Sequence, residues 1–570
     1  MIFALAALRF GLAFPAAILF AALLFSQHPA QAANDDLPDS GTLTIGITQF
    51  PSTLNPNIDS MLAKTYVLGM TSRPLTHYGV DWLPFCMLCV ELPSLDDGSA
   101  WLEDLPSGKK GIAVTYTLQP DATWGDGIPV TTDDVLFTWQ VGKNPKSGVA
   151  NAEMYKRIRA ITIKDDKTFV LHLDRVTFDY PSLPDFRLLP AHIERPIFEA
   201  DPAEYRNRTA FDTDPTNPGL SFGPYSITRI ERGAEIELLP NIRWWGDPPA
   251  FDRIIIRTIE NTAALEANLL SGAIDMVSGE LGFSLDQALA FEARHGDKYN
   301  IIFKPGLIYE HIDLNLDNPL LELEGVRKAL LMGIDRQAIS EKLFKSKQPV
   351  ANSSVSPLDW IYDPNARRYA YDPKAAIAIL EEIGFTQVKN GVRYNAAGTK
   401  LSLEIMTTAG NRSREMVEQV LKSQLKKIGV ELIIRNEPAR VFFGQTLTRR
   451  KFTGLAMFAW YSSPENAPRS TLYSDQIPTA ANGWTGQNYT GYKNSEMDKL
   501  IDAIEVELDR EKRKKLWGRL QDLYTQDLPV LPLYWRAEAY VLPIWLKGIR
   551  PTGHQGTTSL WVEQWYRAEN

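Results

Sequence analysis

SREMVEQVLKSQLKKIGVELIIRN, residues 413–436, determines the fold class of this chain. Residues 413–428 predict a helix, and Gly429 is the kind of residue that commonly ends one. The short β-branched run 431–436 follows at once and predicts a strand. A helix that passes through one glycine into a strand is typical of an α/β protein.

Helices and strands alternate along most of the remaining sequence. Strands are predicted from short β-branched runs bounded by turn residues, at 42–48, 113–118, 169–173 and 252–259. Further helices are predicted at 131–139, 372–383, 494–507 and 509–525. No short-period repeat interrupts this pattern, so we expect α/β lobes and not a solenoid.

Two of these helices are predicted from their first residues. Thr131 and Asp134 have the spacing of a capping box, in which each side chain bonds the other's backbone N–H. Asp372 is a typical N-cap, and Pro373 suits the first position of a helix because its missing N–H would have no partner there.

The N-terminus predicts export. Residues 12–25 are almost purely apolar, Arg9 precedes them, and Ala30-Gln31-Ala32 forms a small-x-small cleavage site. The alternative is a membrane anchor, which needs about 20 apolar residues. Because this run is shorter and ends in a cleavage site, we interpret residues 1–32 as a signal peptide and expect a periplasmic protein that begins at Ala33.

Composition indicates a large globular protein. The chain has 570 residues, of which 44% are hydrophobic and 23% charged. Its formal net charge of −9 argues against a nucleic-acid partner, which would require a basic face. We expect neither a cofactor nor a bound metal, because no P-loop, G-x-G-x-x-G or H-E-x-x-H motif is present.

Cys86 and Cys89 are the only cysteines. A C-x-x-C pair is compatible with a redox motif, half of a zinc site, a short-loop disulfide or two buried thiols. A zinc site needs two more ligands, and the seven histidines have no paired spacing. In an oxidising compartment a structural disulfide is the favoured interpretation, with buried thiols as the next alternative.

A secreted serine hydrolase is the competing class of protein. Residues 219–223, GLSFG, match the G-x-S-x-G nucleophile motif, with Ser221 as the serine. That motif requires a strand-to-helix turn, whereas here a loop precedes the match and a strand-like run follows it. We therefore expect no catalytic residue and interpret Ser221 as part of a structural turn.

The chain resembles the family 5 extracellular solute-binding proteins, the oligopeptide- and dipeptide-binding group of ABC importers. ATWGDGIPVTTDDVLFTWQ (residues 122–140) is similar to the family's aromatic, Asp-Gly turn and Thr-capped helix. The resemblance continues in family order through 221–259, 269–276, 325–339, 371–385 and 491–504.

The resemblance implies a two-lobed, periplasmic-binding-protein-like α/β fold, with a ligand cleft between the lobes and an extra inserted subdomain. Lobe I would comprise residues 33–72, 215–303 and 533–570. The inserted subdomain would be residues 73–214, and lobe II residues 304–532.

The resemblance also directs attention to the segment after Trp460. In peptide-binding members an aspartate shortly after this tryptophan binds the peptide's α-amino group, but Ser463 stands there, with Glu465 two positions on. Either Glu465 takes the place of that aspartate, or the ligand is not a peptide with a free amino group. For a zwitterionic ligand, we predict that Glu465 pairs with its cationic group and that Arg469 binds its carboxylate. The complete set of predicted ligand-binding residues is Trp460, Tyr461, Ser463, Glu465, Arg469, Trp484 and Asn488.

The predicted function is that of a non-catalytic, monomeric binding component of an ABC importer. It would capture a small solute by hinge closure and deliver it to separate permease subunits. A peptide is the leading expectation, and a sugar, a metal chelate or an opine remain alternatives because relatives of the same fold carry them.

Overall fold

The computed structural model describes residues 41–568. The predicted signal peptide, residues 1–32, lies outside this range. Between residues 41 and 568, no helix combines the length and the apolar character needed to cross a membrane.

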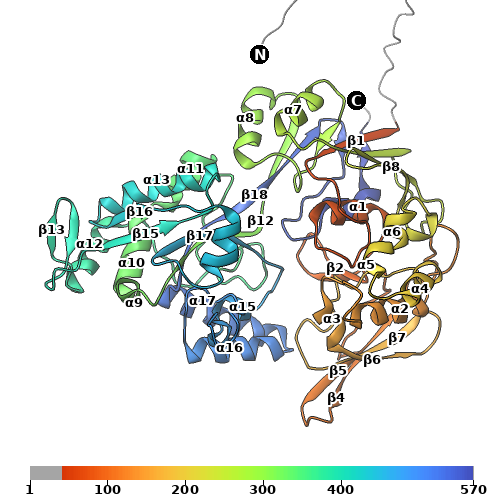
Figure 1. Cartoon of the computed structure of the whole chain (residues 1–570), viewed down its shortest axis with the longest axis horizontal. Coiled ribbons are helices and arrows are strands. Elements are labelled where there is room, and N and C mark those ends of the chain that lie inside the picture. Colours follow the sequence, from red (N-terminus) through yellow and green to blue (C-terminus); the bar gives the residue numbers. More distant parts are fainter. Residues whose placement is uncertain (1–40, 569–570) are drawn as a thin grey trace, which may run out of the picture. The chain divides into compact units, whose positions relative to one another are not determined.

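The main element is a ten-stranded mixed sheet (Figure 1). Strands β1 and β10, β1 and β11, β15 and β16, and β15 and β17 pair in parallel, whereas the other neighbours pair antiparallel. In spatial order the strands are β16 (Glu431–Ile434), β15 (Ser402–Met406), β17 (Leu455–Tyr461), β12 (Tyr299–Leu314), β18 (Val530–Pro543), β11 (Met276–Val277), β1 (Thr42–Ile47), β10 (Arg253–Thr258), β9 (Glu235–Pro240) and β8 (Tyr225–Glu231).

Strands β12 and β18 join the two halves of this sheet. Their antiparallel pairing extends from Tyr299 opposite Pro543 to Asp313 opposite Val530, with register shifts between Pro305 and Tyr309 and between Glu310 and His311. The C-terminal segment enters at the first shift, where the Leu307 N–H donates to the Gly553 carbonyl at 2.9 Å. The shift therefore interrupts a ladder that otherwise continues through both halves.

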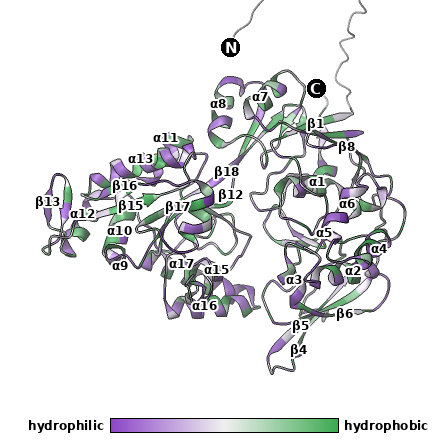
Figure 2. Ribbon diagram, viewed as in Figure 1, coloured by the Kyte–Doolittle hydropathy of each residue, from purple (hydrophilic) through white to green (hydrophobic). Residues whose placement is uncertain are grey.

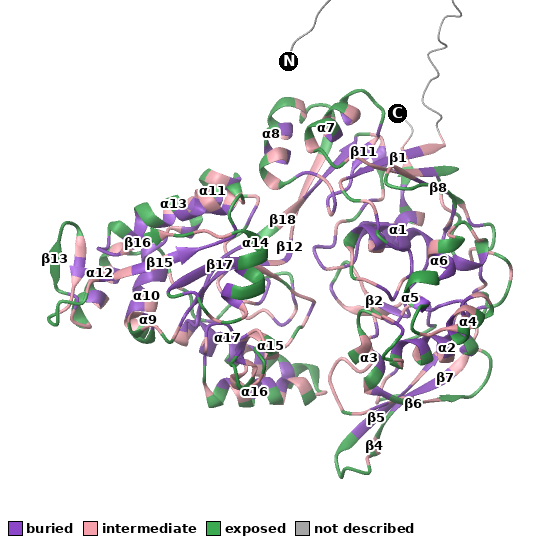
Figure 3. Ribbon diagram, viewed as in Figure 1, coloured by how far each residue is buried: buried purple, intermediate pink, exposed green. Residues whose placement is uncertain are grey.

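Helices pack around the sheet, and the inner strands carry hydrophobic residues that are largely buried (Figures 2 and 3). The longer helices are α1 (Leu62–Thr71), α2 (Thr132–Lys143), α3 (Ala152–Arg157), α4 (Ala191–Ala200), α7 (Thr262–Leu270), α8 (Leu285–His295), α10 (Glu324–Gly333), α11 (Arg336–Phe344), α12 (Pro373–Glu382), α13 (Arg412–Lys426), α16 (Ser495–Val506) and α17 (Arg510–Asp527).

The stretch 413–436 forms helix α13 and strand β16, as predicted. The helix begins one residue early because the Asn411 side chain caps it, accepting a hydrogen bond from the Arg414 N–H. Gly429 has φ +85, a left-handed conformation that glycine adopts without a steric penalty. The other predicted helices and strands are also present, with ends shifted by a few residues.

A second, four-stranded antiparallel sheet lies within the range expected for the inserted subdomain. Its order is β4 (Ala100–Asp104), β5 (Lys110–Thr117), β7 (Thr168–Leu173) and β6 (Ile158–Ile163). It has its own hydrophobic core, which includes Trp124, Tyr116 and Phe169. Other cores surround β1 and β10 and surround β15 and β17. The division of the chain at residues 72, 214, 303 and 532 stays a prediction.

Cys86 and Cys89 form a disulfide, with Cα atoms 5.0 Å apart. Cys86 ends the short strand β3 (Pro84–Cys86), which pairs with β2 (Thr76–Tyr78), and Cys89 is fully buried. This pairing is the favoured one of the alternatives that the sequence leaves open.

Asp134 links the capping box to the surrounding loops. Its carboxylate accepts hydrogen bonds from the backbone N–H groups of Thr131 (2.9 Å) and Ala191 (2.8 Å). The indole Nε1–H of Trp124 donates to the same carboxylate at 3.3 Å. Asp134 is buried, whereas the side chain of its neighbour Asp133 is 64% exposed and pairs with Arg195.

The two adjacent aspartates give a matched test of this arrangement. Asp134→Ala leaves three buried donors without their acceptor, so we expect it to lower the free energy of unfolding by about 3 kcal/mol. Asp133→Ala breaks an exposed ion pair and is expected to change it by about 0.5 kcal/mol or less. Chemical denaturation of both variants measures this, and equal losses would contradict the role given to Asp134.

Candidate functional site

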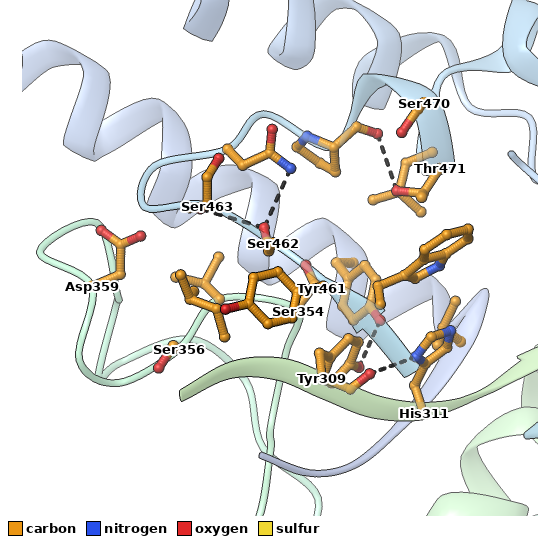
Figure 4. Close-up of a pocket in the computed structure, with 18 of the residues that line it drawn as sticks. Tyr309, His311, Ser354, Ser356, Asp359, Tyr461, Ser462, Ser463, Ser470 and Thr471 are labelled. Carbon is orange, nitrogen blue, oxygen red and sulfur yellow. Dashed lines mark hydrogen bonds between the residues drawn. The ribbon is translucent and has the colours of Figure 1, made fainter. Parts of the chain in front are cut away.

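A cavity of about 130 Å³ lies beside the end of strand β17 (Figure 4). Strand β17 pairs with β12, so Trp460 stands opposite Tyr309 and Tyr461 opposite Ile308. The segment that follows Tyr461 turns over the cavity and brings Ser462 and Ser463 to its wall. The cavity is comparable in volume to one that holds a single benzene-sized group, so it suits one side chain and not a whole peptide.

One part of the wall is aromatic and another is polar. Tyr309 and Tyr524 share a hydrogen bond of 2.9 Å between their hydroxyls, and the His311 ring stacks on Tyr309 with centroids 5.0 Å apart. The other lining aromatics are Trp460, Tyr461 and Trp517. The polar wall consists of Asp313, Ser354, Ser356, Asp359, Ser462, Ser463, Asn466, Ser470, Thr471 and Gln487. Flat apolar surface beside hydroxyls and carboxylates is the composition of a small-molecule binding site.

Asp359 is the buried carboxylate of the polar wall (Figure 4). Its Oδ2 accepts a hydrogen bond from the Glu465 N–H at 2.7 Å. No cationic side chain of residues 41–568 forms an ion pair with it. Burial raises the pKa of Asp359 from 3.8 to about 6, because desolvation disfavours the charged form.

Three of the predicted ligand-binding residues line this cavity: Trp460, Tyr461 and Ser463. Trp460 is held in place by Phe458, at a centroid distance of 5.3 Å, and by Tyr489, at 6.0 Å. Tyr461 is half-exposed, so it remains accessible to a ligand. Their part in ligand binding stays a prediction.

Glu465 and Arg469 line a separate cavity and already have ionic partners within the protein. Glu465 forms an ion pair with Arg513 and accepts a hydrogen bond from the Trp360 Nε1–H at 3.0 Å. Arg469 pairs with Asp502 and, at 2.7 Å, with Glu505. The charges expected to be free for a ligand are thus paired within the protein, and a part of Glu465 and Arg469 in ligand binding stays a prediction.

Trp484 and Asn488 lie away from the cavity wall. The Asn488 amide is fully buried and donates to the carbonyls of Tyr473 (3.0 Å) and Tyr492 (2.9 Å), so it braces a loop. Its part in ligand binding stays a prediction. Trp484 sits in an exposed loop with φ +63 and lines neither the 130 Å³ cavity nor the cavity beside Glu465 and Arg469.

Sequence reasoning missed His311, Asp313 and Asp359. The first two lie on β12, where the predominantly apolar run 307–314 contains several buried polar residues. Buried charged groups inside a strand are a recognisable signal of a polar site. Asp359 gives no such signal, because it sits in a loop where aspartate is common.

A larger cavity, of about 440 Å³, also has Tyr461 on its wall. Its walls come from the loop before α1, from α3, from residues 184–187 and from residues 555–556. Tyr461 is the residue that lines both this cavity and the 130 Å³ cavity. The two spaces therefore meet at one aromatic side chain.

The G-x-S-x-G match is a structural turn. A short 3-10 helix, Pro218–Leu220, precedes Ser221, and β8 follows at Tyr225. Ser221 is buried and extended, and its carbonyl accepts a hydrogen bond from the Gly125 N–H at 2.7 Å. The strand-to-helix turn that a nucleophilic serine requires is not formed at this position.

Comparisons with known proteins agree with this architecture. Residues 107–479 match the family described as bacterial extracellular solute-binding proteins, family 5 Middle. The chain is 25% identical over 468 residues to the oligopeptide-binding protein AppA of Bacillus subtilis (strain 168), covering 80% of this chain and 81% of that protein.

Solved structures give the same result. The oligopeptide-binding protein from Thermus thermophilus, complexed with a pentapeptide, is 29% identical with a TM-score of 0.68 and covers 93% of this chain and 96% of its own. NikZ from Campylobacter jejuni, in complex with Ni(L-His), is 24% identical with a TM-score of 0.69. The match covers 93% of this chain and 100% of NikZ. The fold is therefore the two-lobed α/β fold of periplasmic binding proteins.

The raised pKa of Asp359 predicts that Asp359→Asn stabilises the folded protein in a pH-dependent way. The folded protein favours the protonated carboxyl, so wild type loses stability as the pH rises from about 4 through about 6. Relative to wild type, the variant should be more stable at pH 7.5 than at pH 4 by up to about 3 kcal/mol.

Thermal and chemical unfolding at both pH values measure this difference. Asp104→Asn serves as the control, because the Asp104 side chain is 84% exposed and its ion pair with Lys110 lies at the surface. If the stability difference between Asp359→Asn and wild type were the same at pH 4 and pH 7.5, the buried carboxylate would have another source of compensation.

Proposed function

The chain belongs to the bacterial extracellular solute-binding proteins of family 5, and on that premise we propose that it captures a short peptide for an ABC importer. The observation that carries the proposal is the position of Tyr461, which lines both the 130 Å³ and the 440 Å³ cavity. One residue of a peptide fits the smaller cavity, and the neighbouring residues fit the larger one.

The lining chemistry supports a peptide. Hydroxyls and amides such as Ser463, Thr471 and Gln487 both donate and accept hydrogen bonds, as peptide groups require. Tyr461 and Trp460 offer flat surfaces that tolerate different side chains. The relatives named as oligopeptide-binding proteins add independent support.

Capture is proposed to occur by closure of the two lobes around strands β12 and β18. A ligand drives closure only through its higher affinity for the closed form, so contacts to both lobes are needed. Tyr461 is at the border between the two cavities, where such a contact would be made. The closed monomer would then dock on permease subunits, with the ATPase on a separate chain.

Binding to synthetic peptides tests the proposal. A pool of random tri- to pentapeptides is incubated with the purified mature protein, and native mass spectrometry identifies those that bind. We expect the bound peptides to be recovered intact and to reduce the radius of gyration in small-angle scattering. Cleavage that vanishes in Ser221→Ala would instead support a hydrolase, and selective binding of a sugar or a metal chelate would support the non-peptide alternatives.

Tyr461→Ala tests the shared wall of the two cavities. Loss of a central aromatic contact is expected to weaken peptide binding by about 10-fold or more, measured by titration calorimetry. Tyr566→Ala is the matched control, since Tyr566 is 50% exposed, Tyr461 is 51% exposed, and Tyr566 lines neither cavity. Equal affinities of the two variants would remove Tyr461 from the binding site.

Export is the remaining part of the proposal. If Ala30-Gln31-Ala32 ends a signal peptide, the intact mass of protein recovered from the periplasm should correspond to a start at Ala33. A mature protein that retained residues before Gln27 would contradict cleavage at this site.

A further inference from the structure

The 440 Å³ cavity contains an unusual number of buried polar atoms without a hydrogen-bond partner among residues 41–568. They are Nη1 of Arg187, the hydroxyl of Tyr155, both ring nitrogens of His77 and Oε1 of Gln555. Buried polar groups are almost always satisfied, because each unpaired one loses its hydration without compensation. Four such side chains on one cavity wall indicate a binding site for a polar group.

These four side chains come from separate parts of the chain. His77 belongs to β2 and Tyr155 to α3, while Arg187 and Gln555 lie in loops. The Arg187 loop is anchored through its backbone, since its carbonyl accepts a hydrogen bond from Asn57 Nδ2 at 3.0 Å. The Arg187 guanidinium takes no part in this hydrogen bond, so the side chain remains free to bind a group in the cavity.

The positive charge of Arg187 has no ion-pair partner on this wall, and only the more distant Asp185 carboxylate attracts it. Within residues 41–568, no carboxylate lies within 4.0 Å of the Arg187 guanidinium. Asp185 is the nearest acidic residue in sequence, but it is exposed and accepts a hydrogen bond from Asn151 at 3.2 Å. The other acidic residue on the wall, Asp59, pairs with Arg206.

A second cation adds to this field. The Lys64 ammonium is fixed by four backbone carbonyls, those of Asn55, Pro56, Ile58 and Asp59, at 2.6 to 3.2 Å. Burial, followed by repulsion from Arg187, lowers the pKa of Lys64 to about 8. Two cations close enough to repel each other favour an anion between or beside them.

We propose that this cavity is a subsite for a carboxylate of the transported solute, with Arg187 as its ionic partner and Tyr155 and His77 as further donors. The inference rests on the proposed function, in that the carboxylate belongs to a captured solute. A guanidinium presents two parallel N–H groups that match the two oxygens of a carboxylate. Tyr155 can donate its hydroxyl proton to the same group.

His77 has the protonation state that this arrangement needs. Burial lowers the pKa of His77 well below its ordinary value, and the neighbouring His554 and Arg187 add to the effect. The ring is therefore neutral at pH 7, with one N–H to donate. Tyr461, which completes the wall from β17, allows the bound group to contact elements on both sides of the cavity and so to favour closure.

Acetate is the probe that tests the subsite without a peptide. The thermal shift of the full mature protein is followed in sodium acetate and in sodium chloride of equal ionic strength, for wild type, Arg187→Gln and Arg159→Gln. Arg159 is the control because it is a half-exposed arginine paired with Glu103, and it lines none of the cavities. We expect Arg187→Gln alone to weaken the acetate-specific stabilisation, by about 10-fold in apparent affinity.

The same experiment separates a ligand-binding arginine from a structural one. An unpaired, desolvated charge is unfavourable in the folded protein, so Arg187→Gln without acetate should melt at the wild-type temperature or above it. A structural arginine would instead give a clearly lower melting temperature. That result, or an acetate response equal to wild type, would overturn the proposal.

Peptide pools identify the source of the carboxylate. One pool contains only uncharged residues with free C-termini, the second is the same pool with amidated C-termini, and the third is amidated and carries one Glu per peptide. If the terminal carboxylate is bound, the second and third pools should bind wild type about 10-fold more weakly than the first, and Arg187→Gln should remove this difference. If a side-chain carboxylate occupies the subsite instead, the third pool should bind wild type about 10-fold more tightly than the first and second, and Arg187→Gln should remove that difference.

The outcomes distinguish this inference from the proposed function. Acetate stabilisation that depends on Arg187, without binding of any peptide pool, supports the subsite and refutes the peptide. Equal binding of all three pools by wild type and by Arg187→Gln supports peptide capture and refutes the subsite. Absence of both effects refutes both.

Discussion

The antiparallel pairing of β12 with β18 is the constraint on which the rest of the structure depends. These strands, Tyr299–Leu314 and Val530–Pro543, are distant in sequence, yet they form the central ladder of the ten-stranded sheet. Because backbone hydrogen bonds leave little freedom along a ladder, both halves of the sheet take their positions from this pair. The register shift after Pro305 is where the ladder is interrupted and where the C-terminal segment enters. A local irregularity in a long strand pair is a natural place for bending, since fewer hydrogen bonds resist it.

The site follows from the same pairing. Tyr461 is the last residue of β17 and stands opposite Ile308, beside the interrupted part of β12. Just beyond it the Ser462 N–H still donates to the Leu307 carbonyl at 3.2 Å before the chain turns away, and Tyr461 lines both cavities. An aromatic side chain at this border touches whatever occupies either space. The side chain proposed to contact the ligand therefore lies beside the interrupted part of the central ladder.

Much of the fold could be predicted because the signals are local. Asn411 and Gly429 mark the ends of α13, and Thr131 with Asp134 marks the start of α2, through bonds made within a few residues. The positions of Trp460, Tyr461 and Ser463 on the cavity wall also follow from the family pattern. The state of the charged residues could not be predicted in the same way. Glu465 is paired with Arg513 and Arg469 with Asp502 and Glu505, and these partners lie 33 to 48 positions away. Ion pairing depends on tertiary packing, which a motif read along the chain does not contain.

The distribution of charge therefore distinguishes ion-paired from unpaired residues in a way that motif position does not. Glu465 and Arg469 stand where a family pattern draws attention, but their charges are neutralised inside the protein. Arg187 and Asp359 stand in loops without a motif, and each keeps a charge that no ion pair among residues 41–568 compensates. Maintaining an uncompensated buried charge costs free energy, so such a charge persists where something outside the folded chain compensates it part of the time. For Arg187 this is the basis of the proposed carboxylate subsite, in which the closed and occupied form of the two-lobed protein would supply the compensation.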